Sequence, residues 1–282
     1  MLSKEFAFHA PAELDETLAL LAESEGIVKV LAGGMSLVPA MNLGLVRPDV
    51  VISLNHVPGL DYVEHTGDSV RIGAMVRHHR LVADPLIASS FPLLAAAAAL
   101  VGDVQIRHRG TIGGSLSHAD PAADYLPVIV ALGATLKLRS REGERAVRAR
   151  DFLVDIMLTD LRPDELLAEV ELPKLPDGAG SAYLRLARVE GSFAIVSAAA
   201  VVDGGRPRVA IGGATGAPVL VEPGVDLAGG LSEDALEEIG QAAYTACEDA
   251  FGDLNGSAEY RRELARVYAR RAVEAAHADR SS

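Results

Sequence analysis

The chain has 282 residues, and 49% of them are hydrophobic, so it can bury a large core and is not a disordered segment. This length predicts two domains rather than one. A formal net charge of −13 argues against binding to nucleic acid or to an anionic membrane surface. The sole cysteine, Cys247, excludes an intrachain disulfide, a thiolate-ligated zinc site and a four-thiolate iron–sulfur cluster within this chain.

Neither a secretion signal nor a membrane span is predicted. Charges at Lys4 and Glu5 interrupt the first apolar residues too early for the apolar segment of a signal peptide. The uncharged residues 86–102 contain Pro92 and fall short of the about twenty apolar residues that a membrane span needs. We therefore expect a cytoplasmic protein.

Apolar spacing predicts the elements of the N-terminal half. In residues 11–21, leucines at helical spacing follow a proline and acidic residues, which predicts an amphipathic helix. Two β-branched runs, residues 27–32 and 50–54, predict buried strands. Further along, the same patterns predict a strand, an alanine-rich packed helix and a hairpin around Gly143, at residues 69–74, 92–101 and 134–148.

Prolines and glycines cluster at residues 173–180, where we place a domain boundary near residue 178. Beyond it, residues 193–202 and 208–211 predict two strands around a turn of Asp203, Gly204 and Gly205.

Two helices are predicted to close the chain, with Ser232 and Ser257 as their N-caps. The second helix places four apolar or aromatic residues on one face: Tyr260, Leu264, Val267 and Tyr268. Its basic residues are interpreted as a solvated or subunit-facing stripe rather than an anion site: Arg261, Arg262, Arg266, Arg270 and Arg271.

Two segments join an apolar run to paired glycines and a small polar residue. Glycine permits a positive φ and a close approach, and it lets successive N–H groups converge on an anion such as a diphosphate. Tight turns are the alternative for either segment alone. Neither fits a P-loop or a Rossmann fingerprint. The first glycine loop is Leu31, Ala32, Gly33, Gly34, Met35, Ser36 and Leu37; the second spans residues 109–121 and includes Thr111, Ile112, Gly113, Gly114, Ser115, His118 and Asp120.

Both loops resemble motifs of the FAD-binding medium subunit of the molybdenum hydroxylases, in the form typified by aerobic carbon monoxide dehydrogenase. Residues 32–37 are similar to the family's A-G-G-[QH]-S-L loop. Residues 105–124 are similar to its Q-I-R-N-R-G-T-I-G-G-N-L-x-H-A-D-P-A-A-D motif, and residues 193–200 look like a further family strand. Three positions depart from the family pattern, each losing a polar or charged group: Met35, Ser115 and Ser192.

The resemblance implies an α+β fold of the PCMH type, also called vanillyl-alcohol-oxidase-like, in which FAD lies between two subdomains. It implies an FAD-binding domain at residues 1–177, with subdomains at about 1–56 and 57–177. A C-terminal domain of the carbon monoxide dehydrogenase flavoprotein type, with a small antiparallel sheet and helices, then covers residues 178–282. Beyond residues 31–37 and 111–115, the implied FAD contacts are His118, Asp120, Asp124, Leu161 and Arg185.

The resemblance also implies a division of labour among subunits. A large molybdopterin subunit oxidises substrate, a small subunit carries [2Fe–2S] clusters, and this chain receives the electrons and passes them to an external acceptor. The implied assembly is a dimer of heterotrimers. The lone Cys247 agrees with this, because the chain cannot build the clusters itself. A stand-alone flavin oxidase or reductase and a flavin-less assembly module are the alternatives.

We assign no catalytic side chain and no metal site, because a flavin itself performs the chemistry. His78 and His79 lack an accompanying carboxylate or thiol set. His118 is interpreted as a structural hydrogen-bonding residue rather than a proton carrier. Phe193 and Tyr183 each fit either contact with the isoalloxazine ring or core packing.

Overall fold

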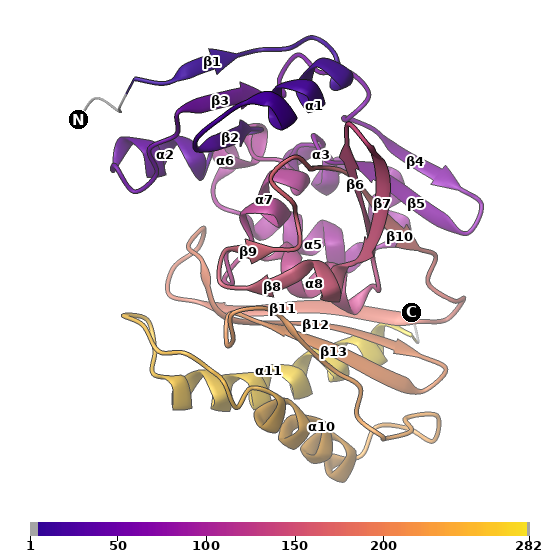
Figure 1. Ribbon diagram of the computed structural model, residues 1–282. Coiled ribbons are helices and arrows are strands. Elements are labelled where there is room, and N and C mark those ends of the chain that lie inside the picture. The colour runs from indigo at the N-terminus through magenta and orange to yellow at the C-terminus, as the bar shows by residue number, and fades with distance from the viewer. Residues whose placement is uncertain (1–4, 281–282) are drawn as a thin grey trace.

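The N-terminal part of the chain forms a parallel three-stranded sheet in the computed structural model, which describes residues 5–280 (Figure 1). Its strands, in the order β1-β3-β2, are β1 (Ala7–His9), β3 (Val50–Ser53) and β2 (Val28–Leu31). The predicted amphipathic helix is confirmed as α1 (Leu14–Glu23), which buries Leu18 and Leu21. The short helix α2 (Leu37–Asn42) follows the first glycine loop.

The prediction of two buried strands in this sheet is half right. β3 is central, and its side chains from Val51 onward are buried. β2 is an edge strand whose side chains are half-buried or exposed, so the prediction that it is buried is wrong. A β-branched run indicates a strand, but whether the strand has one neighbour or two depends on segments far away in the sequence.

A second, antiparallel sheet has the strand order β4-β5-β10-β6-β7 and confirms the predicted strand and hairpin. Its strands are β4 (Val63–Thr66), β5 (Ser69–Gly73), β10 (Leu166–Pro173), β6 (Thr135–Ser140) and β7 (Gly143–Arg148). A two-stranded ribbon is formed by β8 (Leu153–Asp155) and β9 (Leu158–Thr159).

Short helices pack on this sheet and form the main hydrophobic core. The alanine-rich helix is confirmed as α5 (Pro92–Leu100). The others are α3 (His78–Ala83), α4 (Pro85–Ser90), α6 (Val104–Arg109), α7 (Ile112–His118), α8 (Tyr125–Ala131) and α9 (Ala149–Phe152). Much of the second glycine loop is therefore helical, because α7 lies within it.

A third, antiparallel sheet follows the predicted boundary, which falls between β10 and β11. Its strands are β11 (Gly180–Ala187), β12 (Ala194–Asp203), β13 (Arg206–Gly212) and β14 (Val219–Val221). The predicted turn between β12 and β13 is confirmed, with Gly204 and Gly205 both at positive φ. Figure 1 shows helices α10 (Glu233–Ala246) and α11 (Ala258–Asp279) below this sheet and the rest of the chain above it.

Strand β12 is buried on both faces. Ala199 and Val201 belong to the main core beneath the five-stranded sheet. Ala198, Ala200 and Val202 alternate with them and belong to a separate core between this sheet and the helices α10 and α11. The third sheet is therefore the boundary between two hydrophobic cores.

Both C-terminal helices begin as predicted, with Ser232 and Ser257 as N-caps. Only half of the predicted apolar face of α11 packs inward: Leu264 and Tyr268 are partly buried against the C-terminal core, whereas Tyr260 and Val267 are exposed. Small side chains allow a helix to approach a sheet closely. The buried stripe of α11 consists instead of Ala265, Ala269, Ala272, Val273 and Ala276.

The interpretation of the basic residues of α11 as a solvated or subunit-facing stripe is wrong for Arg261. Its guanidinium is buried, donates to the carbonyls of Ile195 and Gly213, and lies 2.6 Å from Asp253 Oδ1. Arg270 pairs with Glu237 of α10 at 3.0 Å. Arg261 thus connects α11 to the neighbouring strands from within, because burial of a cation requires partners, while Arg270 connects α11 to α10 from a partly exposed position.

Candidate functional site

The first glycine loop connects β2 to α2 and presents backbone donors. Gly34 has a φ of +80°, the left-handed conformation that favours glycine. Within residues 5–280, the amide N–H groups of residues 33–37 meet no acceptor. Successive amide groups around a left-handed residue form a concave binding site for an anion. This loop has the donor geometry that a diphosphate requires.

The second glycine loop is built differently, because its amides already have partners. Ile112 N–H donates to Val76 O at 3.0 Å, and Gly113 N–H donates to Ala74 O at 2.9 Å. Thr111 caps α7 by accepting from Gly114 N–H at 3.1 Å. The glycines here serve close packing, since a Cβ on Gly113 would lie 2.7 Å from Ala74 O. This loop therefore offers hydroxyl groups, from Thr111 and Ser115, rather than free amides.

The two loops lie against each other. A Cβ added to Gly33 would lie 2.7 Å from Gly110 Cα and closer still to Arg109 O. A Cβ on Gly114 would lie 3.4 Å from Ala32 Cβ. The glycines at this contact allow the two backbones to approach, and the fold brings together segments almost eighty positions apart in the sequence.

Two residues that the sequence analysis missed bridge the loops. Asn55, just after β3, donates to Ala32 O at 3.3 Å. Arg77, just before α3, donates to Arg109 O and to Asn55 Oδ1. No local motif includes either residue. Asn55 directly follows the strand predicted at residues 50–54, whereas Arg77 adjoins no predicted element.

His78 supports the second loop from behind. It is buried, its Nδ1 lies 3.0 Å from the Tyr125 hydroxyl, and its Cδ2 lies 2.6 Å from where a Cβ on Gly110 would be. Burial lowers the pKa of His78 to about 4, and repulsion from Arg77 and Arg107 adds to this effect. The imidazole is therefore neutral at pH 7.

We expect acid to destabilise the fold through His78. Between pH 6.5 and 4 the unfolded state binds a proton on this imidazole while the folded state does not, so stability falls as the pH falls. The free energy of unfolding should decrease by about 2 kcal/mol between pH 7 and pH 5 through this group. Urea unfolding at both pH values should show that His78→Gln lacks this decrease. The exposed neighbour provides the control, His79→Gln, which should behave as the unmodified chain does.

Asp124, Tyr183 and Arg185 form a buried polar cluster between α8 and β11. The Tyr183 hydroxyl donates to Asp124 Oδ1 at 2.6 Å, and Arg185 Nη1 lies 3.0 and 3.1 Å from the two carboxylate oxygens. Burial raises the pKa of Asp124, although both partners oppose that rise. The cluster connects the FAD-binding part predicted at residues 1–177 with the C-terminal sheet.

The remaining predicted site residues lie around the end of α7. Asp120 Oδ1 accepts from Ala122 N–H at 2.9 Å and so caps the turn after α7. His118 is the last residue of α7, and Leu161 packs at the edge of the main core near β9, which contacts α7.

The two aromatic residues with open interpretations are separated by the structure. Tyr183 is buried in the main core, where its hydroxyl is bonded to Asp124. Phe193 is 64% exposed, which excludes core packing for this side chain within the chain alone. Leu43, Val189 and Leu254 are also exposed apolar residues, on loops next to α2, β11 and α11.

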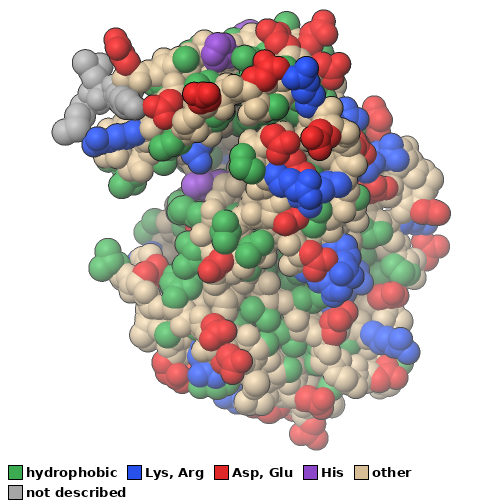
Figure 2. Space-filling model, in the orientation of Figure 1, with side chains coloured by type: hydrophobic (Ala, Val, Ile, Leu, Met, Phe, Trp, Pro, Cys, Tyr) green, Lys and Arg blue, Asp and Glu red, His purple; other side chains and the backbone are tan. Residues whose placement is uncertain are grey.

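Figure 2 shows a hollow at its left side, between the upper part of the molecule and the part below, with hydrophobic side chains around its rim. In Figure 1, α2 lies above this gap, and β8, β9 and the loop between β11 and β12 lie below it. The first glycine loop leads directly into α2, so it lies on this side of the molecule.

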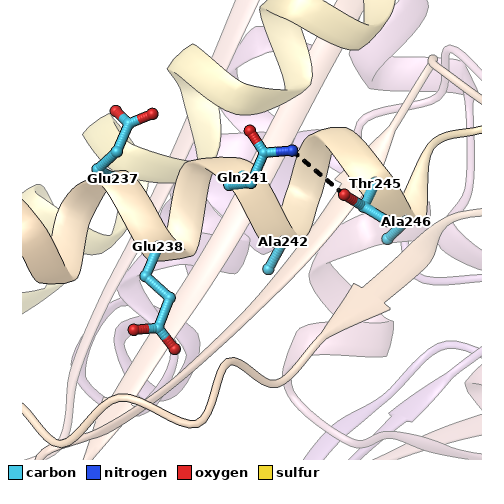
Figure 3. A pocket seen from close by; sticks show the side chains of 6 residues that line it. All are labelled: Glu237, Glu238, Gln241, Ala242, Thr245 and Ala246. Atoms are coloured by element: carbon cyan, nitrogen blue, oxygen red, sulfur yellow. Dashed lines mark hydrogen bonds between the residues drawn. The ribbon is translucent and has the colours of Figure 1, made fainter.

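A separate shallow groove of about 570 Å³ runs along α10 (Figure 3). Its lining includes two carboxylates and no cation, which does not suit a diphosphate. A polar cavity of about 210 Å³ lies on the five-stranded sheet, where Lys137 pairs with Glu169 at 2.6 Å and Arg139 pairs with Glu144 at 2.9 Å. The groove in Figure 3 is lined by Glu237, Glu238, Gln241, Ala242, Thr245 and Ala246.

Within residues 5–280, no group of three or more His, Cys, Asp and Glu side chains is arranged to hold a metal ion. Over the same residues, no helix has the length and apolar character needed to cross a bilayer. The lone thiol, Cys247, is buried at the end of α10, where burial raises its pKa to about 12.

Comparison with known families assigns both parts of the chain. Residues 4–175 match the FAD binding domain in molybdopterin dehydrogenase, and residues 181–276 match the CO dehydrogenase flavoprotein C-terminal domain. The nicotine 6-hydroxylase medium subunit of Paenarthrobacter nicotinovorans is 36% identical, over 94% of this chain and 95% of that protein. The carbon monoxide dehydrogenase medium chain of Hydrogenophaga pseudoflava is 34% identical, over 99% of each chain.

Solved structures agree with these similarities. The carbon monoxide dehydrogenase of Hydrogenophaga pseudoflava, solved without the Mo-pyranopterin moiety of its cofactor, matches with a TM-score of 0.93 over 99% of both chains. Quinoline 2-oxidoreductase from Pseudomonas putida 86 matches with a TM-score of 0.90 at 33% identity over 100% of both chains. The expected α+β fold with an FAD-binding part is confirmed. The chain belongs to the family of FAD-binding medium subunits of the molybdenum hydroxylases, a family of oxidoreductase subunits.

Proposed function

We propose that this chain binds FAD between its glycine loops and serves as the electron-transfer subunit of a molybdenum hydroxylase. The observation that carries the proposal is the row of amide N–H groups at residues 33–37, which meet no acceptor in the described chain and lie next to the second glycine loop. An anionic diphosphate is the ligand class that such a row of donors fits.

The proposed contacts divide into three kinds. The amides of residues 33–37 hold the diphosphate, and the Thr111 and Ser115 hydroxyls approach it from the second loop. Asp124, which is held by Arg185 and Tyr183, is proposed to accept a hydrogen bond from the cofactor. The other proposed contacts are the side chains or backbone of Leu31, Ala32, Leu37, Ile112, Gly113, Gly114, His118, Asp120, Leu161 and Arg185.

The departures from the family motif leave this arrangement in place. Met35 presents its backbone amide as the usual residue would, although its side chain cannot donate or accept as a polar side chain does. The Ser115 amide donates to Thr111 O at 3.0 Å, so Ser115 offers only its hydroxyl. Ser192 donates to Val189 O at 2.8 Å and closes the turn between β11 and β12. The amide donors at residues 33–37 do not depend on these side chains.

Bound FAD would supply the ability to take up electrons one at a time and to release them as a pair. The chain's own contribution would be to hold the cofactor through the amides of the first loop and the hydroxyls of the second. The chain contains one cysteine and cannot build a four-thiolate cluster itself, and we propose that the electrons come from [2Fe–2S] clusters of a small partner subunit. A large molybdopterin subunit oxidises the substrate, and an external acceptor removes the electrons from this chain.

Several relatives carry names that describe subunits of larger complexes, among them the medium chain of glyceraldehyde dehydrogenase from Sulfolobus acidocaldarius. We propose the same organisation for this chain, as a dimer of heterotrimers with large and small subunits. We also propose that residues 1–177 and 178–282 act as two domains of one flavoprotein. The cytoplasmic location expected from the sequence stays a prediction.

A titration of the purified full-length chain with FAD tests the proposal. We expect saturable binding of equimolar FAD, seen as quenching of flavin fluorescence and a shifted absorption band. The bound flavin should then stay oxidised with organic donors alone, because the oxidising centre lies in another subunit. It should become reduced when a reduced [2Fe–2S] protein is supplied as electron donor.

Two results would contradict this function. A chain that stays colourless with excess FAD would be a flavin-less assembly module. Rapid reduction of the bound flavin by an organic substrate, with no iron–sulfur protein present, would identify a stand-alone oxidase or reductase.

A further inference from the structure

We propose that Asn55 and Arg77 form a clamp that holds the two glycine loops at the separation that the FAD diphosphate requires. They act as positioning residues and make no contact with the cofactor in this proposal. The inference rests on the proposed function, because it concerns how the same loops are kept in place. It is carried by a continuous chain of hydrogen bonds from one loop to the other.

Arg77 forms the end of the clamp at the second loop. Its backbone pairs with Thr111 in an isolated antiparallel bridge, so the side chain starts next to this loop. Nη1 donates to Arg109 O, and Nη2 donates to Asn55 Oδ1 at 3.1 Å. A guanidinium can hold two acceptors at once because its donors lie in one rigid plane, which an ammonium group does not offer.

Asn55 forms the end at the first loop. Its Nδ2 donates to Ala32 O at 3.3 Å and to Ser53 Oγ at 2.9 Å. Arginine has only donors, so the amide oxygen of Asn55 must face Arg77, and this orients the amide nitrogen toward Ala32. Ser53 is buried in the central strand β3, which anchors the clamp to the sheet.

The two ends grip the loops at their point of contact. Ala32 directly precedes Gly33, and Arg109 O is the atom closest to the position of a Cβ on Gly33. The clamp therefore fixes the distance between the amides of residues 33–37 and the hydroxyls of the second loop. A displacement of about 1 Å in such a site is enough to weaken binding strongly.

The test compares variants of the clamp with a variant of a nearby arginine, Arg80, which lies in the helix that follows Arg77. Asn55→Leu keeps the shape of the side chain and removes its hydrogen bonds. Arg77→Lys keeps the charge and removes the planar guanidinium that holds two acceptors at once. The control is Arg80→Gln, because Arg80 pairs with Asp61 at 2.8 Å and touches neither loop in any hydrogen bond of the described chain. The full-length apo chain is titrated with FAD and with ADP, and its thermal midpoint is measured without ligand.

We expect each clamp variant to raise the Kd for FAD and for ADP by the same factor, about tenfold. The Kd of the double variant should be little higher than that of the weaker-binding single variant, because both substitutions break the same hydrogen-bonded connection between the loops. The thermal midpoint of the apo chain should change no more than in the control.

Unchanged Kd values in both variants would overturn the clamp while leaving the proposed function intact, provided that the unmodified chain binds FAD. If the free-energy losses of FAD binding from the two single variants add fully in the double variant, the inference is overturned. It is also overturned if the weaker binding accompanies a large fall in the apo thermal midpoint, because the two residues then have only a structural role. Failure of the unmodified chain to bind FAD would overturn both the proposed function and the clamp.

Discussion

Replacement of Gly33 by alanine is expected to abolish tight FAD binding while leaving the chain folded. The added Cβ would lie 2.7 Å from Gly110 Cα and closer to Arg109 O. These are backbone atoms that cannot rotate away, so the two loops must separate. Overpacking of this kind costs about 3 kcal/mol, which corresponds to a Kd about a hundredfold higher. Fluorescence titration of the purified Gly33→Ala chain with FAD measures the effect.

A matched glycine provides the control for this experiment. Gly229 has no atom within 4 Å of an added Cβ and does not have a left-handed φ, so Gly229→Ala should bind FAD as the unmodified chain does. Retention of tight binding by Gly33→Ala would mean that the contact between the loops is irrelevant to the cofactor. Circular dichroism and the thermal midpoint show whether the variant keeps its fold.

Removal of the buried Arg261 cation should lower the free energy of unfolding more than any other substitution proposed above. Arg261→Met leaves the carbonyls of Ile195 and Gly213 without this donor and removes the cation that pairs with Asp253. Breaking a buried ion pair costs about 3 kcal/mol, and the partial exposure of Asp253 places this pair at the lower end of the range. For a chain of this size the thermal midpoint should fall by roughly 6 to 12 °C.

Arg271 is the matched control, because it is exposed on the same helix and lies over the Tyr268 ring at 5.6 Å. Arg271→Met should change the thermal midpoint by little, since exposed contacts of this kind contribute weakly. Equal melting of the two variants would show that Arg261 does not hold the ends of β12 and β13 and the 251–256 loop together.

The sequence was sufficient for the elements with strong local signals. The leucine spacing of α1, the serine caps of α10 and α11 and the glycine turn between β12 and β13 are determined by residues close together in the chain. The glycine loops were recognisable for the same reason, since each has a compact motif. The sequence did not reveal that the amides of residues 33–37 meet no acceptor among residues 5–280, while amides of the second loop donate to Ala74, Val76 and Thr111.

The features that could not be predicted depend on neighbours that are distant in the sequence. The edge position of β2 follows from its single partner β3. The burial of Arg261 follows from carbonyls at residues 195 and 213 that no helical periodicity encodes. Asn55 and Arg77 belong to no motif, and only the folded chain places them between Ala32 and Arg109. Helical periodicity identified α11 and its larger apolar side chains, but not the stripe of alanines that is fully buried.

The double burial of β12 has a consequence for how such a protein can be divided. A cut near residue 178 would remove Ala199 and Val201 from the main core and expose the apolar side chains that pack against them to water. The same cut would leave one apolar face of the third sheet exposed to solvent in the C-terminal fragment. We therefore expect neither half to fold alone. Gene fusions, split proteins or domain transfers that use this chain should keep the third sheet together with both of the cores that it borders.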